Sequence, residues 1–270
     1  MKHFKYLVTS GCSFSDVATR DTWPAYLDTA YGIEYIHTGL ASQGNSLIAR
    51  KTIFAVQQLL NQGVNPDEIL VGMMWSNPDR HDAYFSNLND QLPAHVKYLD
   101  AMRVNPTAYV DDDPGGWLIM NPHWKQKTSN IYYSYLHDFV NHRINTYEKI
   151  LWVQYYLKVS GIKYFMVPFT DKVFKNEEFQ NNPNVQWMKT LVDWTQWLPV
   201  DSMHEWCYTH WTAKDFPTID VQNSTTGKLV KQIDNHPTDF MHKRFTKEII
   251  LPHIKNTFPD YFCPEIEDTV

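Results

Sequence analysis

Residues 4–16 read Phe-Lys-Tyr-Leu-Val-Thr-Ser-Gly-Cys-Ser-Phe-Ser-Asp, a short apolar run that stops at Gly11 and is followed at once by Ser13. The run predicts a buried first strand over Lys5–Gly11. Glycine takes backbone angles closed to other residues, so we expect a sharp turn that leaves Ser13 exposed at the carboxyl edge of a sheet. Such a serine is a candidate nucleophile, although small polar residues after a strand are also ordinary turn chemistry.

Further strands and helices alternate after this stretch. Apolar segments that fit buried strands recur at Glu34–Leu40, Glu68–Ser76 and Lys163–Thr170. Between them, Thr22 is in position to cap a helix that begins at Trp23, and Asn45–Leu60 carries a wide apolar stripe. Alternation of this kind predicts an α/β fold, a three-layer α/β/α sandwich with a mainly parallel sheet. Ligands of such sheets bind where the strands end.

The second half of the chain is less regular. A long helix is expected from about Tyr132 to Ser160, and a last helix from about Pro237 to Ile254. Residues 82–130 lose the strand and helix rhythm and are interpreted as an irregular, cap-like insertion. Residues 171–230 are rich in tryptophan and fit helix and loop, where core packing is the favoured role over a sugar-binding platform. No linker or repeat divides the chain, so one domain is predicted over residues 1–270.

Composition excludes several classes of protein. The formal charge is −6 and the pI about 6.0, so neither nucleic acid nor an anionic membrane is expected as a partner. Three scattered cysteines fit no disulfide framework and suit a reducing compartment. The amino-terminal apolar stretch is too interrupted for a signal peptide, and no run approaches the length of a membrane span. A cytoplasmic protein is expected, with association with a virion as an alternative.

Two candidate cofactor motifs fail on spacing. His204-Glu205 is followed by His210, which does not share a helix face with His204 as a zinc-binding pair would. Thr226–Leu229 lacks the upstream glycine and the hydroxyl residue of a phosphate-binding loop. No metal and no cofactor are therefore expected.

Four short blocks stand where the predicted strands end or the last helix begins. They are Gly11-Cys-Ser13-Phe, Gly39-Leu-Ala-Ser-Gln-Gly44-Asn, Trp75-Ser-Asn77-Pro and Asp234-Asn-His236-Pro. Together they resemble the SGNH (GDSL-type) hydrolase superfamily. Their order and rough spacing match it across nearly the whole chain, most closely in its divergent members from phage and environmental genomes. The resemblance implies a flavodoxin-like sheet with the four blocks at one edge.

The resemblance also implies a role for each block. Ser13 would be the nucleophile, His236 its base, and Asp234 the acid that orients the imidazole. The oxyanion would be bound by the backbone N–H groups of Ser13 and Gly44 and by the side-chain amide of Asn77.

The blocks depart from the family pattern at several positions. Cys12 stands where the family has aspartate, and a buried inert thiol is favoured there over a cysteine nucleophile. Asp234 lies two residues before His236 instead of three, so Asp220 or Asp215 is an alternative acid. Arg80 is a candidate contact for an acidic substrate group, although a solvated pair with Asp79 or Asp82 is the favoured interpretation.

The predicted activity is hydrolysis of an ester by a serine nucleophile. The expected partner is a small-molecule or glycan ester, with O-acyl groups on carbohydrate preferred because aromatic residues make up 15% of the chain. Acyl transfer with the same residues is a variant of this prediction. The alternative is a catalytically silent module of the same fold that binds a glycan or assembles into a particle. The sequence leaves the oligomeric state open.

Overall fold

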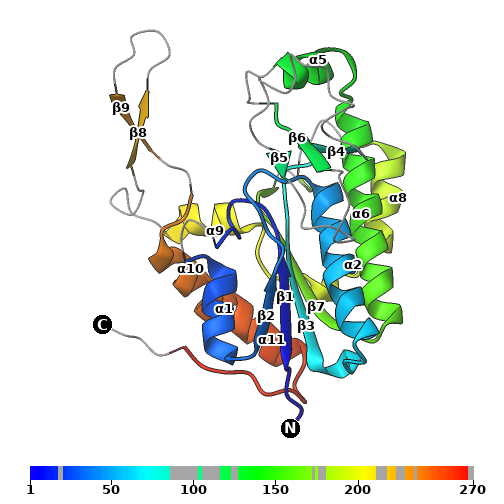
Figure 1. Cartoon of the computed structure of the whole chain (residues 1–270), viewed down its shortest axis with the longest axis vertical. Helices are drawn as coiled ribbons and strands as arrows, with labels where there is room; N and C mark the ends of the chain where they lie inside the picture. The colour runs from blue at the N-terminus through cyan, green and yellow to red at the C-terminus, as the bar shows by residue number, and fades with distance from the viewer. Residues whose placement is uncertain are drawn as a thin grey trace.

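Four parallel strands form the central sheet in the described part of the chain. The structure is a computed structural model that describes residues 1–17, 21–85, 103–104, 116–122, 127–171, 174–175, 181–210, 218–222, 229–233 and 236–266. The sheet has the order β2-β1-β3-β7 (Figure 1). The strands are β1 (Tyr6–Ser10), β2 (Glu34–His37), β3 (Ile69–Trp75) and β7 (Lys163–Pro168). The predicted α/β fold with a mainly parallel sheet is confirmed.

Helices cover both faces of this sheet. On one face lie α2 (Asn45–Asn61), α6 (Phe139–Val159) and α8 (Pro183–Leu191). On the other lie α1 (Trp23–Tyr31), α9 (Met203–His210), α10 (Asp239–Phe245) and α11 (Leu251–Thr257). Figure 1 shows the two layers on either side of the strands. The three-layer arrangement buries both faces of the sheet, which is why its strands are apolar throughout instead of alternating.

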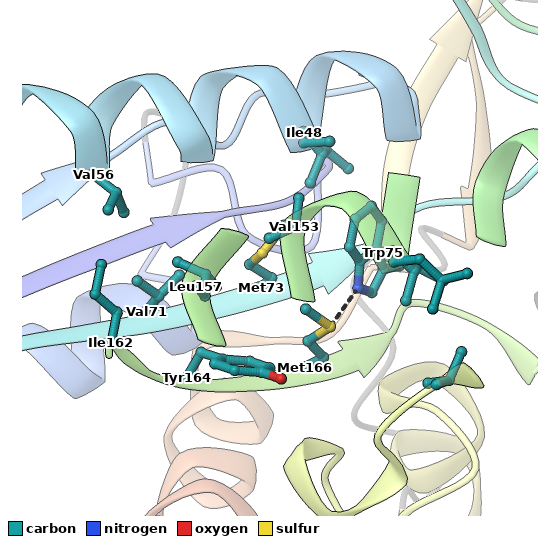
Figure 2. Close-up of a cluster of buried hydrophobic side chains, with 14 of the residues drawn as sticks. Ile48, Val56, Val71, Met73, Trp75, Val153, Leu157, Ile162, Tyr164 and Met166 are labelled. Atoms are coloured by element: carbon teal, nitrogen blue, oxygen red, sulfur yellow. Dashed lines mark hydrogen bonds between the residues drawn. The ribbon is translucent and has the colours of Figure 1, made fainter. Parts of the chain in front are cut away.

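Strand β3 joins the two cores. All seven of its residues are buried, and successive side chains point to opposite faces. Val71, Met73 and Trp75 enter the core beneath α2 and α6, where Trp75 Nε1 lies 3.3 Å from Met166 Sδ (Figure 2). Leu70 and Met74 enter the opposite core. Burial of apolar surface on both faces makes this strand a major source of the fold's stability.

The register of the strands determines where the site forms. Ser10, the last residue of β1, pairs with Met73 near the end of β3. Because the pairing is parallel, Gly11–Ser13 and Ser76–Asn77 leave the sheet at the same edge. The loop after β2, which leads through Gly39 to Gly44, leaves at this edge as well.

Two predicted helices differ from the observed ones. The single helix expected over Tyr132–Ser160 is two, α5 (Lys127–Tyr135) and α6, because Asp138 caps α6 by accepting a hydrogen bond from the Asn141 N–H at 2.7 Å. The expected last helix begins at Asp239 with Thr238 as its cap, and continues from α10 through the π-helical turn η4 (Thr246–Ile250) into α11.

The irregular segments contain further short elements. In the predicted insertion, β4 (His81–Phe85) and β5 (Arg103–Val104) pair antiparallel with β6 (Gly116–Met120). The remaining elements are the 3-10 turns η1 (Pro66–Glu68) and η3 (Trp194–Gln196) and the antiparallel pair β8 (Thr218–Gln222) and β9 (Leu229–Ile233). Among the described helices, none combines the length and the apolar character needed to cross a bilayer. One domain over residues 1–270 stays a prediction.

Candidate active site

Ser13 lies in a tight turn directly after β1. The Ser15 N–H donates to the Cys12 carbonyl oxygen at 2.8 Å, which closes the turn. The turn does not require unusual backbone angles at Gly11, whose φ is not among the positive values of the described glycines. Glycine is needed for space, since a Cβ there would overlap the Ser15 side chain and lie 3.0 Å from Met74 Cβ. The expected position of Ser13 at the sheet edge is observed, but for a different reason than predicted.

Trp23 holds this turn against the carboxyl-terminal helices. Its Nε1–H donates to Ser15 Oγ at 2.9 Å, and its backbone N–H donates to His242 Nδ1 of α10 at 3.2 Å. Thr22 stands at the N-cap position of α1, but its hydroxyl donates to the Ser15 carbonyl oxygen at 3.1 Å and makes no cap hydrogen bond. Thr22, which was predicted to cap α1, therefore stabilises the turn that carries Ser13 instead.

His236 meets Ser13 from the far end of the chain. Its Nε2 lies 2.8 Å from Ser13 Oγ across 223 residues of sequence. Both side chains are partly exposed. The Phe14 ring, 3% exposed, lies 5.1 Å from the imidazole and 4.5 Å, edge on, from the Phe169 ring. A serine and an imidazole at hydrogen-bond distance, both within reach of solvent, have the geometry of a nucleophile and its base.

Cys12 is enclosed next to this pair. The thiol residue is fully buried in the core beneath α1 and α10, whereas its neighbour Ser13 is partly exposed. A nucleophile has to meet its substrate, so the favoured interpretation of Cys12 as a buried packing residue agrees with its position.

Three carboxylates are predicted partners of His236. Asp234 and the alternative Asp215 lie outside the described residues, and for Asp220 in β8 only the backbone is described. A different histidine near Phe14, His204, has a described carboxylate partner: its Nδ1 lies 3.1 Å from Glu205 Oε1. The second oxygen of Glu205 accepts the Asp171 N–H at 3.1 Å.

Asn77 follows β3 in a polar turn. Its Oδ1 accepts the Asp79 N–H at 3.1 Å, and its carbonyl oxygen accepts the Arg80 N–H at 3.1 Å. The oxygen of the amide is engaged inside the turn, whereas its nitrogen donates to no partner among the described contacts and is available as a donor. The preceding residue is fixed by Asn45, whose side chain bonds both the N–H and the carbonyl oxygen of Ser76.

Gly44 differs from its expected role. It is the N-cap residue of α2, and its N–H donates to Asp82 Oδ1 at 2.9 Å. A Cβ at this position would lie 2.6 Å from Asp82 Oδ2, so the glycine allows the carboxylate to approach. The amide that the resemblance assigns to the oxyanion is thus occupied by a carboxylate in this arrangement.

Asp82 was not singled out as a site residue. It is buried and caps α2 from β4, with Oδ2 accepting the Leu47 N–H at 3.1 Å. Burial raises the pKa of its carboxyl to about 6, against the lowering effect of these two hydrogen bonds and of the nearby Arg80 and Lys51. A carboxylate that caps a helix from a distant strand leaves no local signal, because helix-capping patterns in sequence are read within a few residues.

No protein-family model and no curated protein matches the chain in sequence. Its backbone is similar to the solved structure of a protein described as lipolytic and of the G-D-S-L family, from Desulfitobacterium hafniense DCB-2. The two share 11% sequence identity and a TM-score of 0.41, over 94% of this chain and 99% of that chain. Similarity at this level assigns no activity.

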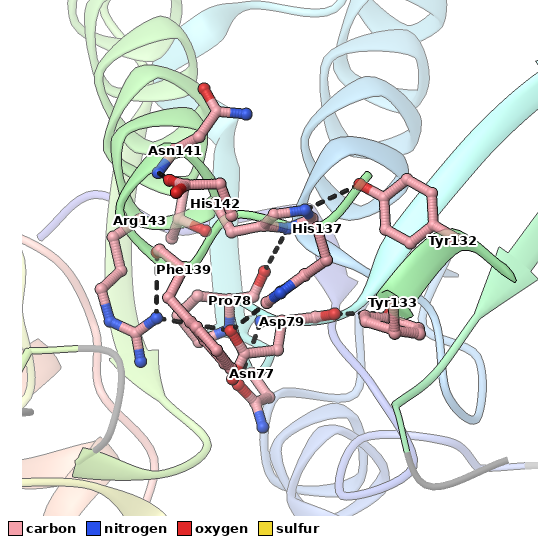
Figure 3. A network of polar contacts seen from close by, with 12 residues as sticks. Asn77, Pro78, Asp79, Tyr132, Tyr133, His137, Phe139, Asn141, His142 and Arg143 are labelled. Carbon is pink, nitrogen blue, oxygen red and sulfur yellow. Dashed lines mark hydrogen bonds and ion pairs between the residues drawn. The ribbon is translucent and has the colours of Figure 1, made fainter. Parts of the chain in front are cut away.

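A network of polar contacts supports the turn that carries Asn77 (Figure 3). Asp79 Oδ1 lies 3.3 Å from an Arg143 nitrogen and 3.5 Å from His137 Nε2, and Tyr133 donates to the Asp79 carbonyl oxygen at 2.6 Å. His142 Nδ1 lies 3.1 Å from the Pro78 carbonyl oxygen and therefore carries the proton. The sequence pattern gave no sign of this network, because the turn after β3 lies far along the chain from the α5–α6 stretch that supplies its partners.

Arg80 does not form the predicted ion pair with Asp79 or Asp82 among the described contacts. Its Nη1 donates to Ser76 Oγ at 2.8 Å, and its guanidinium carbon lies 5.7 Å from the centre of the Phe169 ring. Asp79 is neutralised by Arg143 instead. In the part of the chain that the structure describes, no group of three or more histidine, cysteine or carboxylate side chains has the geometry of a metal site.

Proposed function

We propose that the protein is a hydrolase that cleaves ester bonds, with Ser13 as nucleophile and His236 as general base. The observation that carries the proposal is the distance of 2.8 Å between Ser13 Oγ and His236 Nε2. The two residues lie 223 positions apart, so their contact has to be built by the fold and does not follow from chain proximity. The motif resemblance to SGNH hydrolases supports the same assignment.

The chemistry would proceed in two steps. His236 takes the Ser13 proton as Oγ attacks the ester carbonyl, and returns it to the leaving alcohol as the acyl-serine forms. Water, deprotonated by His236, then attacks the acyl-serine, and His236 returns that proton to Ser13 Oγ as the acyl–Oγ bond breaks and the acid is released. The Ser13 N–H and the side-chain amide nitrogen of Asn77 are the proposed oxyanion donors, each worth about 3 kcal/mol in the transition state. Asp234 is proposed to orient the imidazole.

The preferred substrate is an acylated carbohydrate. An open cavity of about 700 Å³ lies at the carboxyl end of β7, lined by Pro168 and by the rings of Phe174, Trp194 and Trp197. Trp194 is 44% exposed, so its ring is accessible to a sugar face. The same acyl-serine would support acyl transfer if a sugar hydroxyl outcompetes water for the acyl group.

Hydrolysis of p-nitrophenyl acetate tests the mechanism. The wild type is expected to hydrolyse it, Ser13→Ala to be inactive, and Ser134→Ala, an exposed change on α5, to retain activity. A fluorophosphonate probe should add its mass to the peptide that contains Ser13 and to no other. Wild-type activity in Ser13→Ala would overturn the assignment of the nucleophile.

The second candidate is a catalytically silent binding or structural module. It is favoured by one observation, the hydrogen bond from the Gly44 N–H to Asp82, which occupies an expected oxyanion donor. In this case neither the wild type nor Ser13→Ala hydrolyses the ester and the probe does not label Ser13. Binding of a glycan or of a particle component would then be the function to measure.

A further inference from the structure

A small cavity lies between the first turn of α2, the middle of α6 and the Asn77–Arg80 turn. Its volume is about 170 Å³, roughly the space of five or six water molecules. The polar side chains that line it are Asn45, Ser46, Arg80, Asn145, Thr146 and Lys149. A space of this size accommodates one small oxyanion together with a few waters.

The charge of this cavity is positive. Arg80 and Lys149 line it, and no carboxylate does so among the described lining residues. His81 and His142 also line it, but burial lowers the pKa of both imidazoles, that of His81 to about 4, so they add no charge at neutral pH. Of the nearby carboxylates, Asp79 pairs with Arg143, and Asp82 uses its oxygens on the N–H groups of Gly44 and Leu47.

Asn45 donates to the Ser76 carbonyl oxygen and to Thr146 Oγ1, but other donors of the cavity are unused. Lys149, Ser46 and Asn145 make no side-chain hydrogen bond or ion pair within the described ranges, and Arg80 uses Nη1 alone, on Ser76 Oγ. The neighbouring Arg50 does not line this cavity. Its guanidinium carbon lies 5.6 Å from the centre of the Trp117 ring and 5.8 Å from that of the Trp152 ring. Cations and amide or hydroxyl donors that converge without an acceptor suit an oxygen-rich anion.

The cavity is connected to the reacting serine through Arg80. The guanidinium that lines it also lies over the Phe169 ring, which packs edge on against Phe14, the residue after Ser13. Arg80 and Asn77 share one turn, whose backbone is closed by the bond from the Arg80 N–H to the Asn77 carbonyl oxygen. Arg80 therefore contacts both the cavity and the aromatic side chains that pack beside Ser13.

We propose that this cavity is a subsite for an anionic group of the substrate, a phosphate, sulfate or carboxylate held by Arg80 and Lys149. The inference rests on the proposed function for its claim about the substrate. The binding of the anion itself does not require catalysis, so the two claims can fail separately.

Direct titration of the full chain with sodium sulfate tests the binding claim. Calorimetry at low ionic strength is expected to give saturable binding that Lys149→Gln weakens about fivefold, the effect of losing one partly exposed charged contact. Lys158→Gln, an exposed lysine at the end of the same helix, is the matched control and should bind as wild type. Asn145→Asp puts a carboxylate into the cavity and should weaken sulfate binding more than Lys149→Gln does. This variant provides an independent test if Lys149→Gln folds poorly. Equal affinities in all four proteins, or no binding to wild type, would overturn the subsite.

A matched pair of esters tests the link to the substrate. Phenyl acetate and its 4-sulfonate transfer the same acetyl group but differ in the charge and leaving ability of the phenol, so the change in the ratio of their kcat/KM values on mutation reports the subsite. The ratio should favour the sulfonate in wild type and fall about fivefold in Lys149→Gln, as expected for one charged contact. An unchanged ratio with an active enzyme would refute the substrate claim alone. Hydrolysis that persists in Ser13→Ala would refute the proposed function, while the sulfate titration still decides the anion site.

Discussion

The carboxylate of Asp82 accepts the backbone N–H of Gly44 at 2.9 Å, in the position where the motif resemblance expects a donor to the reacting oxyanion. Asp82 is buried and its pKa is raised to about 6. The helix terminus therefore already holds an anion that the protein itself supplies. This contact affects the stability of the protein. It also leaves the Ser13 N–H and the Asn77 side-chain amide as the proposed oxyanion donors.

Asp82 should make the protein less stable as the pH rises from 4 to 7. Its pKa in the folded state lies above the usual 3.8, so the folded protein binds this proton more tightly than the unfolded chain. Its stabilising contribution is present below pH 4 and is lost as the pH passes 6. Relative to Asp82→Asn, wild type should lose roughly 3 kcal/mol of unfolding free energy over this range. Urea denaturation of both proteins at four pH values measures the difference, and a constant difference would contradict the raised pKa.

His37 should have the opposite effect over a similar range. Burial lowers the pKa of its imidazole to about 4, and its Nδ1 lies 2.8 Å from Thr9 Oγ1. The folded protein binds this proton less tightly than the unfolded chain, so the contribution is present above pH 6.5 and is lost as the pH falls towards 4. His37→Phe removes the titration, and its unfolding free energy should fall less than that of wild type on acidification. A parallel acid dependence in both proteins would show that His37 does not drive it.

His236→Gln should reduce kcat for an ester by about 10³-fold, because the general base is lost while the oxyanion donors remain. KM should change little, since the imidazole acts on the Ser13 proton and not on ground-state binding. Steady-state kinetics with p-nitrophenyl acetate give both values. His3→Gln, an exposed histidine stacked on Phe262, serves as the control. A kcat within a few-fold of wild type would remove His236 from the mechanism.

Asp234→Asn should reduce kcat by about 10²- to 10⁴-fold if this residue orients His236, because the imidazole then loses its preferred tautomer. The two-residue spacing to His236 makes Asp220 and Asp215 the alternatives. The same kinetic measurement on Asp220→Asn and Asp215→Asn separates the three. The largest fall in Asp220→Asn or Asp215→Asn would transfer the role to that residue, and no fall in any of them would leave His236 acting without an acid.

Gly11→Ala should destabilise the protein by about 1–3 kcal/mol, the usual cost of forcing extra atoms into a packed core. The added Cβ would overlap Ser15 and displace the turn, so esterase activity should fall as well. Gly63→Ala is an informative comparison, because Gly63 has a φ of 82° and open space around it. It should cost about 1 kcal/mol through backbone strain and leave activity intact. Chemical denaturation and ester hydrolysis of both variants check the prediction, which fails if Gly11→Ala behaves like Gly63→Ala.

Periodicity was sufficient to find the sheet and most of the helices. Each of the four strands is a short apolar run followed by a polar or glycine-rich loop, and for parallel strands buried on both faces this is a strong signal. The same pattern placed Ser13 and Asn77 at one edge. The break at Asp138 was missed because a helix-compatible sequence continues through it, and only the capping bond from the Asn141 N–H reveals the new start.

The polar contacts around the site could not be predicted in the same way. Asp82 caps α2 from β4, and Asp79 pairs with Arg143 across 64 residues. Neither contact can be predicted from the spacing of residues along a helix or strand, because both depend on how the segment after β3 packs against helices that are far away in the chain. The reason for a glycine at position 11 was predicted wrongly for a similar cause. The Ser15 and Met74 side chains leave no room for a Cβ there, and their positions depend on the register of the strands.

The contact between Ser13 and His236 also has a consequence for the synthesis of the protein. The ribosome makes Ser13 first and His236 223 residues later, and α10, which is bonded to Trp23, later still. A chain still being translated therefore carries the serine without its imidazole. The proposed ester cleavage by this pair requires that residues beyond 236 have left the exit tunnel and folded, so we expect a nascent chain to be inactive.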